Sequence, residues 1–310
     1  MSNNKTARRD YIDIMKGLGI LLVVLGHFME QFRFGFKPIG ATFICIYLFH
    51  MALFCICSGL VAHFSLWKLI TQQVWLYAVG QAIMLAFRAV ILREDFAASG
   101  GLLLAFLLPW RHMWYLYALI FWHLTLPLLC LLRDRLGLAG SCLGMALAMA
   151  VGLAGGLIDW PFMLVRVFAF FPFYAFGVLF RPQLDTLAAF AAQNRAARLL
   201  PAAGLAVGYG LYFIRVFCSE TILDNSAELF HDVSYAGGDR PEYRIVFYLV
   251  GIATTAALVA AFSSGRRLTG LGRRTLAIYL LHLPILALLV QLQLFEPLRG
   301  APVALPVLWY

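Results

Sequence analysis

The chain has 310 residues, of which 63% are hydrophobic and 13% are charged, and its mean hydropathy is +0.85. A soluble domain has about 45–50% apolar and about 25% charged residues, so this composition excludes a soluble globular protein and indicates one that crosses a membrane many times. The net charge of +9 does not indicate nucleic-acid binding, because most basic residues lie in short loops between apolar segments.

Apolar segments follow one another along the chain, and a membrane crossing needs about 20 mainly apolar residues. We predict spans at 13–34, 40–64, 70–92, 112–132, 139–158, 162–180, 199–217, 244–262 and 274–294. The apolar stretch 101–109 is too short to cross, so we expect it to be re-entrant or interfacial. Residues 300–310 resemble the start of a further span. The sequence thus predicts an all-α polytopic membrane protein of about nine to ten transmembrane helices, with residues 1–310 as a single domain.

The distribution of charge predicts the orientation. Basic residues gather beside alternate ends of the spans, which is the positive-inside pattern, and most acidic residues fall on the other side. We therefore expect the amino terminus to be cytoplasmic. The first apolar segment carries ionisable residues and has no small-residue cleavage site, so we do not interpret it as a cleavable signal peptide.

The first span carries a lysine and a histidine where lipid-facing residues are expected. Lys16 and His27 are eleven residues apart, so three helical turns place them on one face, separated by roughly 16 Å. Asp13 lies near the same face. This polar seam (Asp13, Lys16 and His27) predicts a path from the inner mouth into the membrane, since intramembrane charges usually face a cavity or a partner. The alternative for Asp13 and Lys16 is that the Lys16 side chain extends to the membrane surface and pairs with Asp13. This alternative leaves His27 unexplained.

Two further histidines lie in later spans. His50 precedes Ser58 in the second span, and His282 lies in the last. Imidazole changes charge near neutrality and suits proton transfer with a hydroxyl, although a single intramembrane histidine also serves as a helix–helix hydrogen bonder. The sequence contains no HxxxH or HExxH pair, so we do not predict a metal site.

Cations and aromatic residues mark other candidate positions. Arg88 and Arg166 lie within or near apolar segments and either bind an anion or pair with a carboxylate or carbonyl. In 109–119, Arg111 and His112 precede Trp114 and Tyr115 in a pattern that suits an outer aromatic belt or a surface that faces a substrate. The hydrophilic segment 218–243 is either a solvated connector or a binding loop for a polar ligand such as a sugar.

Four segments together resemble the membrane-bound acyltransferase 3 family, in particular its fucose 4-O-acetylase-like branch. They are "RRDYIDIMKGLGILLVVLGHF", "FHMALFCICSGL", "HMWYLYAL" and "GRRTLAIYLLHLPI". The first contains the family's basic residue, ten-residue gap and histidine, as Lys16 and His27. The four segments extend from residue 8 to residue 285, so the resemblance covers nearly the whole chain.

The resemblance implies transfer of an acyl group, usually acetyl, from cytoplasmic acyl-CoA to a hydroxyl of a cell-surface glycan or its lipid-linked precursor, by a multi-pass protein of the bacterial inner membrane. By position, His27 is then the essential histidine and Lys16 its basic partner, accompanied by Asp13. A histidine of this kind either deprotonates the acceptor hydroxyl or carries the acyl group. The donor's phosphates need cations at the inner face, and Lys68, Arg266, Arg267, Arg273 and Arg274 are available there, unless they serve only as positive-inside anchors.

The chain departs from the family pattern in three places. Ala52 stands where proline commonly follows His-Met, Lys68 is nearly alone where a basic cluster is usual, and we count nine spans where about ten are typical. A proton-coupled transporter or flippase for a polar or lipid-linked solute is the alternative function, although the inverted repeats typical of transporters are not visible. A structural membrane subunit would leave the polar seam unexplained. If acyl transfer is correct, a cavity is expected to join Lys16 and His27 to the inner face.

Overall fold

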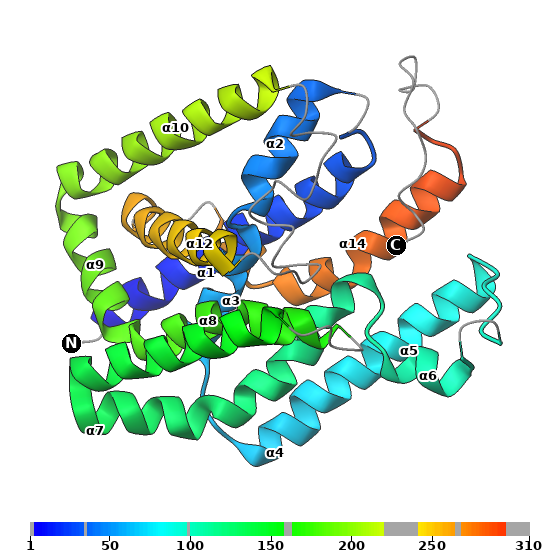
Figure 1. Ribbon diagram of the computed structural model, residues 1–310, viewed down its shortest axis with the longest axis horizontal. Coiled ribbons are helices and arrows are strands. Elements are labelled where there is room, and N and C mark those ends of the chain that lie inside the picture. Colours follow the sequence, from blue (N-terminus) through cyan, green and yellow to red (C-terminus); the bar gives the residue numbers. More distant parts are fainter. Residues whose placement is uncertain are drawn as a thin grey trace.

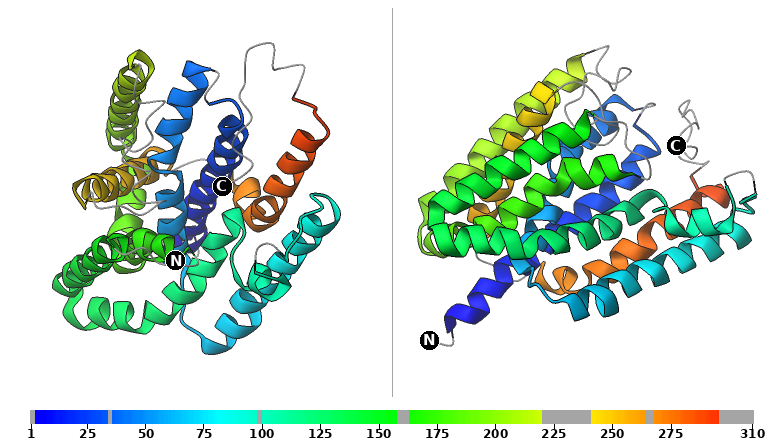
Figure 2. Two further views of the ribbon diagram at one scale, coloured as in Figure 1. Left: turned by 45° about the vertical axis from the view of Figure 1, so that its right-hand side comes forward. Right: turned by 60° about the horizontal axis from the view of Figure 1, so that its bottom comes forward.

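The computed structural model describes residues 3–33, 36–97, 100–157, 163–219, 241–263 and 268–295, and all regular structure within these ranges is helical. The elements are α1 (Asn3–Glu30), α2 (Lys37–Tyr47), α3 (His50–Val61), α4 (Leu66–Lys68), the π-helix η1 (Leu69–Val74), α5 (Trp75–Val90), α6 (Leu102–Leu107), the 3₁₀-helix η2 (Arg111–Met113), α7 (Trp114–Gly156), α8 (Leu164–Leu179), α9 (Arg181–Gln193), α10 (Arg195–Cys218), α12 (Pro241–Ala261), α13 (Thr269–Gly272) and α14 (Thr275–Gln291). Figure 1 shows α1 passing through the middle of the bundle, with the first turns of α1 projecting beyond it in Figure 2.

Six helical segments of the described chain are long and apolar enough to cross a membrane, or seven if the bent pair α8–α9 is one span. This confirms an all-helical chain with several candidate spans, but not the predicted number of nine to ten. The difference has identifiable causes. The predicted spans 112–132 and 139–158 form the two arms of α7, which is counted once although its direction changes at Gly137, and α14 has only 17 residues. The orientation with a cytoplasmic amino terminus stays a prediction.

Helix α7 reverses direction at Gly137. This residue has a φ of 57° and a ψ of −132°, which are not helical angles, and glycine reaches positive φ without the penalty that a Cβ imposes. A Cβ placed on Gly140 would touch the carbonyl oxygen of Leu132, so the two arms of α7 fold back against each other. The turn falls in the predicted loop 133–138, and Figure 1 shows both arms side by side.

The second predicted span is broken in its middle. Helix α2 ends at Tyr47 and α3 begins at His50, because Phe49 has a φ of −143° and a ψ of −19° and so interrupts the helix. His50 is therefore the first residue of a helix and not a residue in the interior of one. Breaks of this kind at membrane depth occur where the backbone is buried in protein or lines a cavity.

The core of the bundle is formed by α3, α8 and the first arm of α7. Gly59 of α3 and Gly177 of α8 bring their backbones into contact, since a Cβ on Gly177 would meet the carbonyl oxygen of Ile56. Small residues at helix crossings permit this approach in membranes. Helix α10 is different, because its residues Leu200, Val207 and Leu211 are all more than half exposed. Such an apolar outer face is expected on a helix that contacts lipid.

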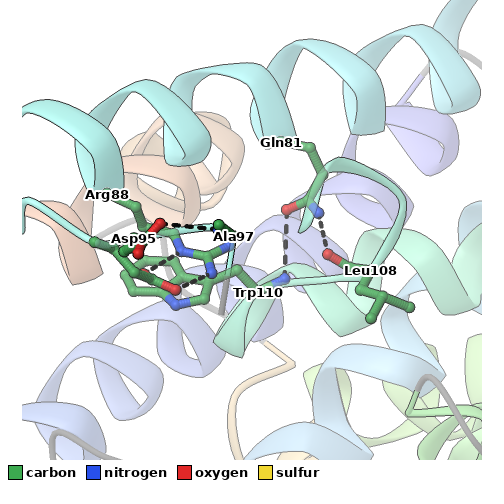
Figure 3. Close-up of polar contacts among 7 residues, drawn as sticks. Gln81, Arg88, Asp95, Ala97, Leu108 and Trp110 are labelled. Carbon is green, nitrogen blue, oxygen red and sulfur yellow. Dashed lines mark hydrogen bonds and ion pairs between the residues drawn. The ribbon is translucent and has the colours of Figure 1, made fainter. Parts of the chain in front are cut away.

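The short apolar stretch at 101–109 forms the six-residue helix α6, which cannot span a bilayer. It packs on α5, where the side chain of Gln81 donates hydrogen bonds to the carbonyl oxygens of Phe106, at 3.1 Å, and of Leu108. The backbone N–H of Trp110 in turn donates to Oε1 of Gln81 at 3.4 Å (Figure 3). The buried amide of Gln81 thus ties the end of α6 and the start of η2 to α5.

Candidate active site

Three histidines from distant parts of the sequence meet at one end of the bundle. The ring centroid of His282, on α14, lies 5.3 Å from that of His27, on α1, and 5.1 Å from that of His112, in η2. We call these three residues the histidine cluster. His282 and His112 are more than nine-tenths buried. The cluster joins a predicted catalytic residue, a predicted supporting residue and a predicted acceptor-side residue in one site.

His27 has two polar partners at Nδ1. The carboxylate oxygen Oε2 of Glu30, one turn later on α1, lies 3.3 Å from Nδ1, and the hydroxyl of Tyr47, at the end of α2, lies 3.5 Å from it. A carboxylate accepts a hydrogen bond from Nδ1–H, so this contact favours the tautomer whose lone pair is on Nε2. His27 lies in the last turn of α1. Helix α1 ends three residues after it, at Glu30.

His282 is held in the same kind of tautomer by backbone. Its Nδ1–H donates to the carbonyl oxygens of Tyr279, at 2.7 Å, and Ile278, at 3.2 Å. A carbonyl only accepts, so Nδ1 carries the proton and Nε2 of the neutral ring carries the lone pair. This Nε2 is buried and has no hydrogen-bond partner within the described part of the chain, and the same is true of both ring nitrogens of His112. Buried polar atoms usually have partners, so these three nitrogens indicate a site for a polar ligand.

Hydroxyl groups continue the site into the core. Tyr279 donates a hydrogen bond to the backbone carbonyl of His112, and its ring lies 5.7 Å from the ring of Tyr115. The hydroxyl of Tyr115 is hydrogen-bonded to that of Ser58 on α3. Ser58 and Tyr115 are thus linked through Tyr279 to the backbone of His112, and the supporting role of Ser58 stays a prediction.

Arg111 lies beside His112 in a strained backbone conformation, with a φ of 45°. Such angles are uncommon for residues with a side chain and gather at functional sites. Its guanidinium carbon lies 5.6 Å from the centroid of the Trp110 ring, and its charge acts on the carboxylate of Glu30. The positive charge of Arg111 thus partly offsets the negative charge of Glu30, the acidic partner of His27.

Arg88, on α5, binds the segment that follows α5 and is not part of the histidine cluster. Its Nε and terminal nitrogen donate to the two carboxylate oxygens of Glu94 at 2.8 and 2.5 Å, and its guanidinium carbon lies 5.0 Å from the Phe96 ring centroid. This hydrogen-bonded pair also lowers the pKa of Glu94 below its ordinary value of 4.5. Of the two alternatives predicted for Arg88, the structure shows pairing with a carboxylate of the chain itself.

The inner mouth of the polar seam is a separate location. Helix α1 is continuous from Asp13 through His27, so Lys16 stays roughly 16 Å along the helix from His27. Asp13 pairs with Arg273, which follows α13, at 3.3 Å between Oδ2 and Nε. The pair can form because α13 packs closely on α1, where a Cβ on Gly272 would touch the Asp13 backbone. The charge of Lys16 acts on the buried Cys57 of α3.

The comparison with protein families now bears on this geometry. A family model described as an acyltransferase domain, of the acyltransferase 3 type, matches residues 9–310. The chain belongs to this acyltransferase 3 family. It is therefore a membrane acyltransferase, and the match covers both the inner mouth and the histidine cluster. No curated protein and no solved structure gives a match, so the fucose 4-O-acetylase-like branch stays a prediction.

The remaining predicted residues of the acyltransferase lie apart from the cluster or outside the described ranges. Lys68 ends α4, Arg274 precedes α14, and Arg166 stands over Trp114 at 5.8 Å. Arg266, Arg267, most of the segment 218–243 and the residues 300–310 lie outside the described ranges. His50 donates from Nδ1 to the carbonyl of Ile46 at 2.9 Å and is buried.

The predicted aromatic belt at Trp114 and Tyr115 is wrong, because both side chains are buried in the core of the acyltransferase. Trp114 packs against Phe170 of α8, with ring centroids 4.9 Å apart. Membrane-interface aromatics have one face in the headgroup region, whereas these two residues are enclosed by helices. No group of three or more metal-ligating side chains is found within the described ranges.

Three polar residues at the acyltransferase site were missed by the sequence interpretation: Glu30, Tyr47 and Tyr279. Each lies three residues from a histidine, since Glu30 follows His27, Tyr47 precedes His50 and Tyr279 precedes His282. Residues three apart are neighbours on a helix. This spacing would have indicated Glu30 as the partner of His27.

Proposed function

We propose that this membrane acyltransferase moves an acyl group from cytoplasmic acyl-CoA to a hydroxyl of a cell-surface glycan or a lipid-linked glycan precursor, with His27 as the reacting base. The observation that carries the proposal is the histidine cluster, in which His27 has a carboxylate at Nδ1 and faces a second buried histidine. The bacterial inner membrane is the location that this function implies.

The chemistry assigns different roles to His27 and His282. Nε2 of His27 takes the proton of the acceptor hydroxyl while the hydroxyl oxygen attacks the thioester carbonyl. The carbon–sulfur bond then breaks, and the proton passes to the departing thiolate. Glu30 stabilises the imidazolium that forms on His27, as the carboxylate of a catalytic triad does. His282 receives no such carboxylate, and its unpartnered Nε2 suits hydrogen bonding to a hydroxyl instead.

A second route uses the same atoms. Nε2 of His27 attacks the thioester first, the thiolate leaves, and the acyl-histidine then passes the acyl group to the acceptor. The carbonyl oxygen gains negative charge in either route, and Arg111 is the nearby cation that can offset it. The cations Lys16, Lys68, Arg273 and Arg274 are proposed to bind the phosphates of the donor at the inner mouth.

The experiment measures acetyl transfer by purified protein in nanodiscs from radiolabelled acetyl-CoA to octyl glycosides of common hexoses and 6-deoxyhexoses. We expect His27→Ala to lower the transfer rate by roughly 10² to 10⁴-fold, the usual contribution of a general base. His63→Ala is the matched control, because His63 is exposed just after α3, and it should keep the wild-type rate. Undiminished transfer by His27→Ala would overturn the assignment.

The transporter alternative is tested with the same preparation. Broken helices such as α2–α3 also occur at the binding sites of transporters. Counterflow of a labelled glycoside across liposomes without any acyl donor would support transport. We expect no counterflow, together with donor-dependent labelling of the glycoside.

A further inference from the structure

A cavity of about 390 Å³ lies between the distal half of α1 and α14. Val24 and Phe28 contribute to its wall from α1, and Ala277, Leu281 and Ile285 contribute from α14. Among the described residues that line this cavity, His282 is the polar one. The cavity does not include Lys16 in its walls, so it differs from the expected path to the inner face.

The cavity adjoins the histidine cluster through His282. The ring of His282 belongs both to the wall and to the cluster, where it lies 5.3 Å from the ring of His27. Its buried Nε2 lacks a hydrogen-bond partner within the described chain. The cavity is partly open at the protein surface, where Phe28, Leu281 and Ile285 are exposed. An occupant therefore lies against apolar side chains of α1 and α14, next to a histidine that belongs to the cluster.

The apolar walls of the cavity limit which molecules can bind in it. A sugar has several hydroxyls, and burying each without a hydrogen bond costs about 1–3 kcal/mol, so the apolar walls exclude the glycan. A phosphate needs cations, and none lines the cavity within the described residues. A membrane lipid tail fits the walls as well as an acyl chain does, and displacement by an acyl-CoA distinguishes the two. An acyl thioester combines a hydrocarbon chain that fits these walls with a carbonyl that can react at the adjacent histidine cluster.

The volume indicates a chain longer than acetyl. One water molecule, with a single heavy atom, occupies about 30 Å³ in the liquid, so the three heavy atoms of an acetyl group need roughly 90 Å³ by the same measure. The cavity of about 390 Å³ has room for about a dozen heavy atoms on this scale. An acetyl group would leave most of it empty.

We propose that this cavity binds the hydrocarbon chain of the donor acyl group, so that the enzyme accepts medium-chain acyl groups. The inference rests on the proposed function. The reaction is the transfer described above, in which the ester bond forms, the thioester bond breaks and the hydroxyl proton ends on the thiolate. The thioester carbonyl lies at the histidine cluster and the chain extends along α14 past Leu281 and Ile285.

Binding of the chain is tested without an acceptor. An octanoyl-CoA analogue with a diazirine near the end of its chain is photolysed with the full-length protein in nanodiscs, and labelled peptides are identified by mass spectrometry. We expect labels within 24–28 and 277–289, lost on addition of excess octanoyl-CoA. Labels that lie elsewhere, or that excess octanoyl-CoA does not displace, would overturn the proposal and identify the cavity as a lipid site.

Chain-length selection is tested by kinetics with acetyl-, butyryl-, octanoyl- and dodecanoyl-CoA. Ala277→Phe fills the cavity, so we expect it to lower kcat/KM for octanoyl-CoA by about 10-fold or more, in the range that one misplaced methylene group produces, and to leave acetyl-CoA nearly unchanged. Leu276→Phe is the matched control, because Leu276 is the preceding, exposed residue of α14 and does not line the cavity. Ile285→Ala enlarges the cavity and should improve use of dodecanoyl-CoA.

Two negative results have different meanings. Transfer of acetyl alone by the wild type, unaltered by either cavity variant, contradicts the chain-binding cavity and leaves the proposed function intact. Absence of transfer from every donor contradicts the proposed function, and the inference falls with it. Loss of acetyl transfer in Ala277→Phe but not in Leu276→Phe would show that the cavity holds the reacting carbonyl itself, which also contradicts the proposal.

Discussion

Glu30 and His27 form the most informative contact at the scale of single residues. The two side chains lie one turn apart at the end of α1 and meet at 3.3 Å. A carboxylate in this place fixes the tautomer of the imidazole and its orientation toward His282. It acts on substrate only through His27, so Glu30 is a positioning residue.

Replacement of this carboxylate should slow the chemical step and spare donor binding. We expect Glu30→Gln to lower kcat by roughly 10 to 100-fold, the usual effect of removing the residue that orients a reactive histidine, with KM for acyl-CoA little changed. Steady-state kinetics at several donor concentrations separate the two constants. Glu30→Asp should recover part of kcat, whereas a rise in KM with constant kcat would assign Glu30 to donor binding.

The Arg88–Glu94 pair makes a separate prediction about stability and pH. The hydrogen bonds from Arg88 hold the pKa of Glu94 below 4.5 in the folded protein, so the pair stabilises the fold above pH 4.5 and loses this effect as the pH falls through the lowered pKa. Glu94→Gln should therefore lower the Tm at pH 7 by a few degrees. The difference from wild type should shrink as thermal unfolding is repeated toward pH 3. A difference that is constant with pH would mean that the carboxylate charge contributes nothing.

At the scale of helices, close approach between α3 and α8 fixes the scaffold behind the site. The backbones of Gly59 and Gly177 touch, and α3 carries both His50 and Ser58. A side chain at either glycine would force the two helices apart. Because the hydroxyl of Ser58 bonds to Tyr115, such a shift would also disturb the support of the histidine cluster.

Gly177→Leu is the test of this crossing. We expect a reduced yield of folded protein. The free energy of unfolding should fall by about 1–3 kcal/mol, the usual effect of overpacking a well-packed core. Gly208→Leu on α10 is the control for the same exchange, because a Cβ there meets no atom within 4 Å. Equal yields of both variants, measured by size-exclusion chromatography after extraction, would show that the crossing tolerates separation.

At the scale of the whole molecule, the site is asymmetric along the bundle. Asp13, Lys16 and Arg273 mark one end, and the histidine cluster lies near the other, where α1 ends. If the amino terminus is cytoplasmic, donor phosphates are bound on one side and the acceptor meets the histidines toward the other. Orientation thus decides which substrate approaches which end.

Orientation is measured by cysteine labelling in a variant without the six native cysteines. Ala97, after α5, and Ala139, beside the turn of α7, are exposed. Figure 1 shows the end of α5 and the turn of α7 toward opposite ends of the bundle. We expect Ala97→Cys to react with a membrane-impermeant maleimide on intact cells and Ala139→Cys to react only after the cells are opened. The reverse pattern would place the amino terminus outside and reassign the donor and acceptor ends.

The sequence by itself determined the class of protein, because an excess of apolar residues in long runs permits only helices across a bilayer. It also indicated His27 and His282 as candidate site residues, since ionisable residues in such runs are costly and usually face a cavity or a partner. Helix periodicity placed Lys16 and His27 on one face, and α1 is indeed continuous between them.

Only the tertiary structure decided which residues share a site. His27, His112 and His282 come from three elements, and contacts between distant segments depend on how whole helices pack, which spacing along one helix does not encode. The same limit explains the burial of Trp114, the pairing of Arg88 with Glu94 and the break before His50. Local pattern is a property of one helix in a bilayer, whereas the active site is a property of the bundle.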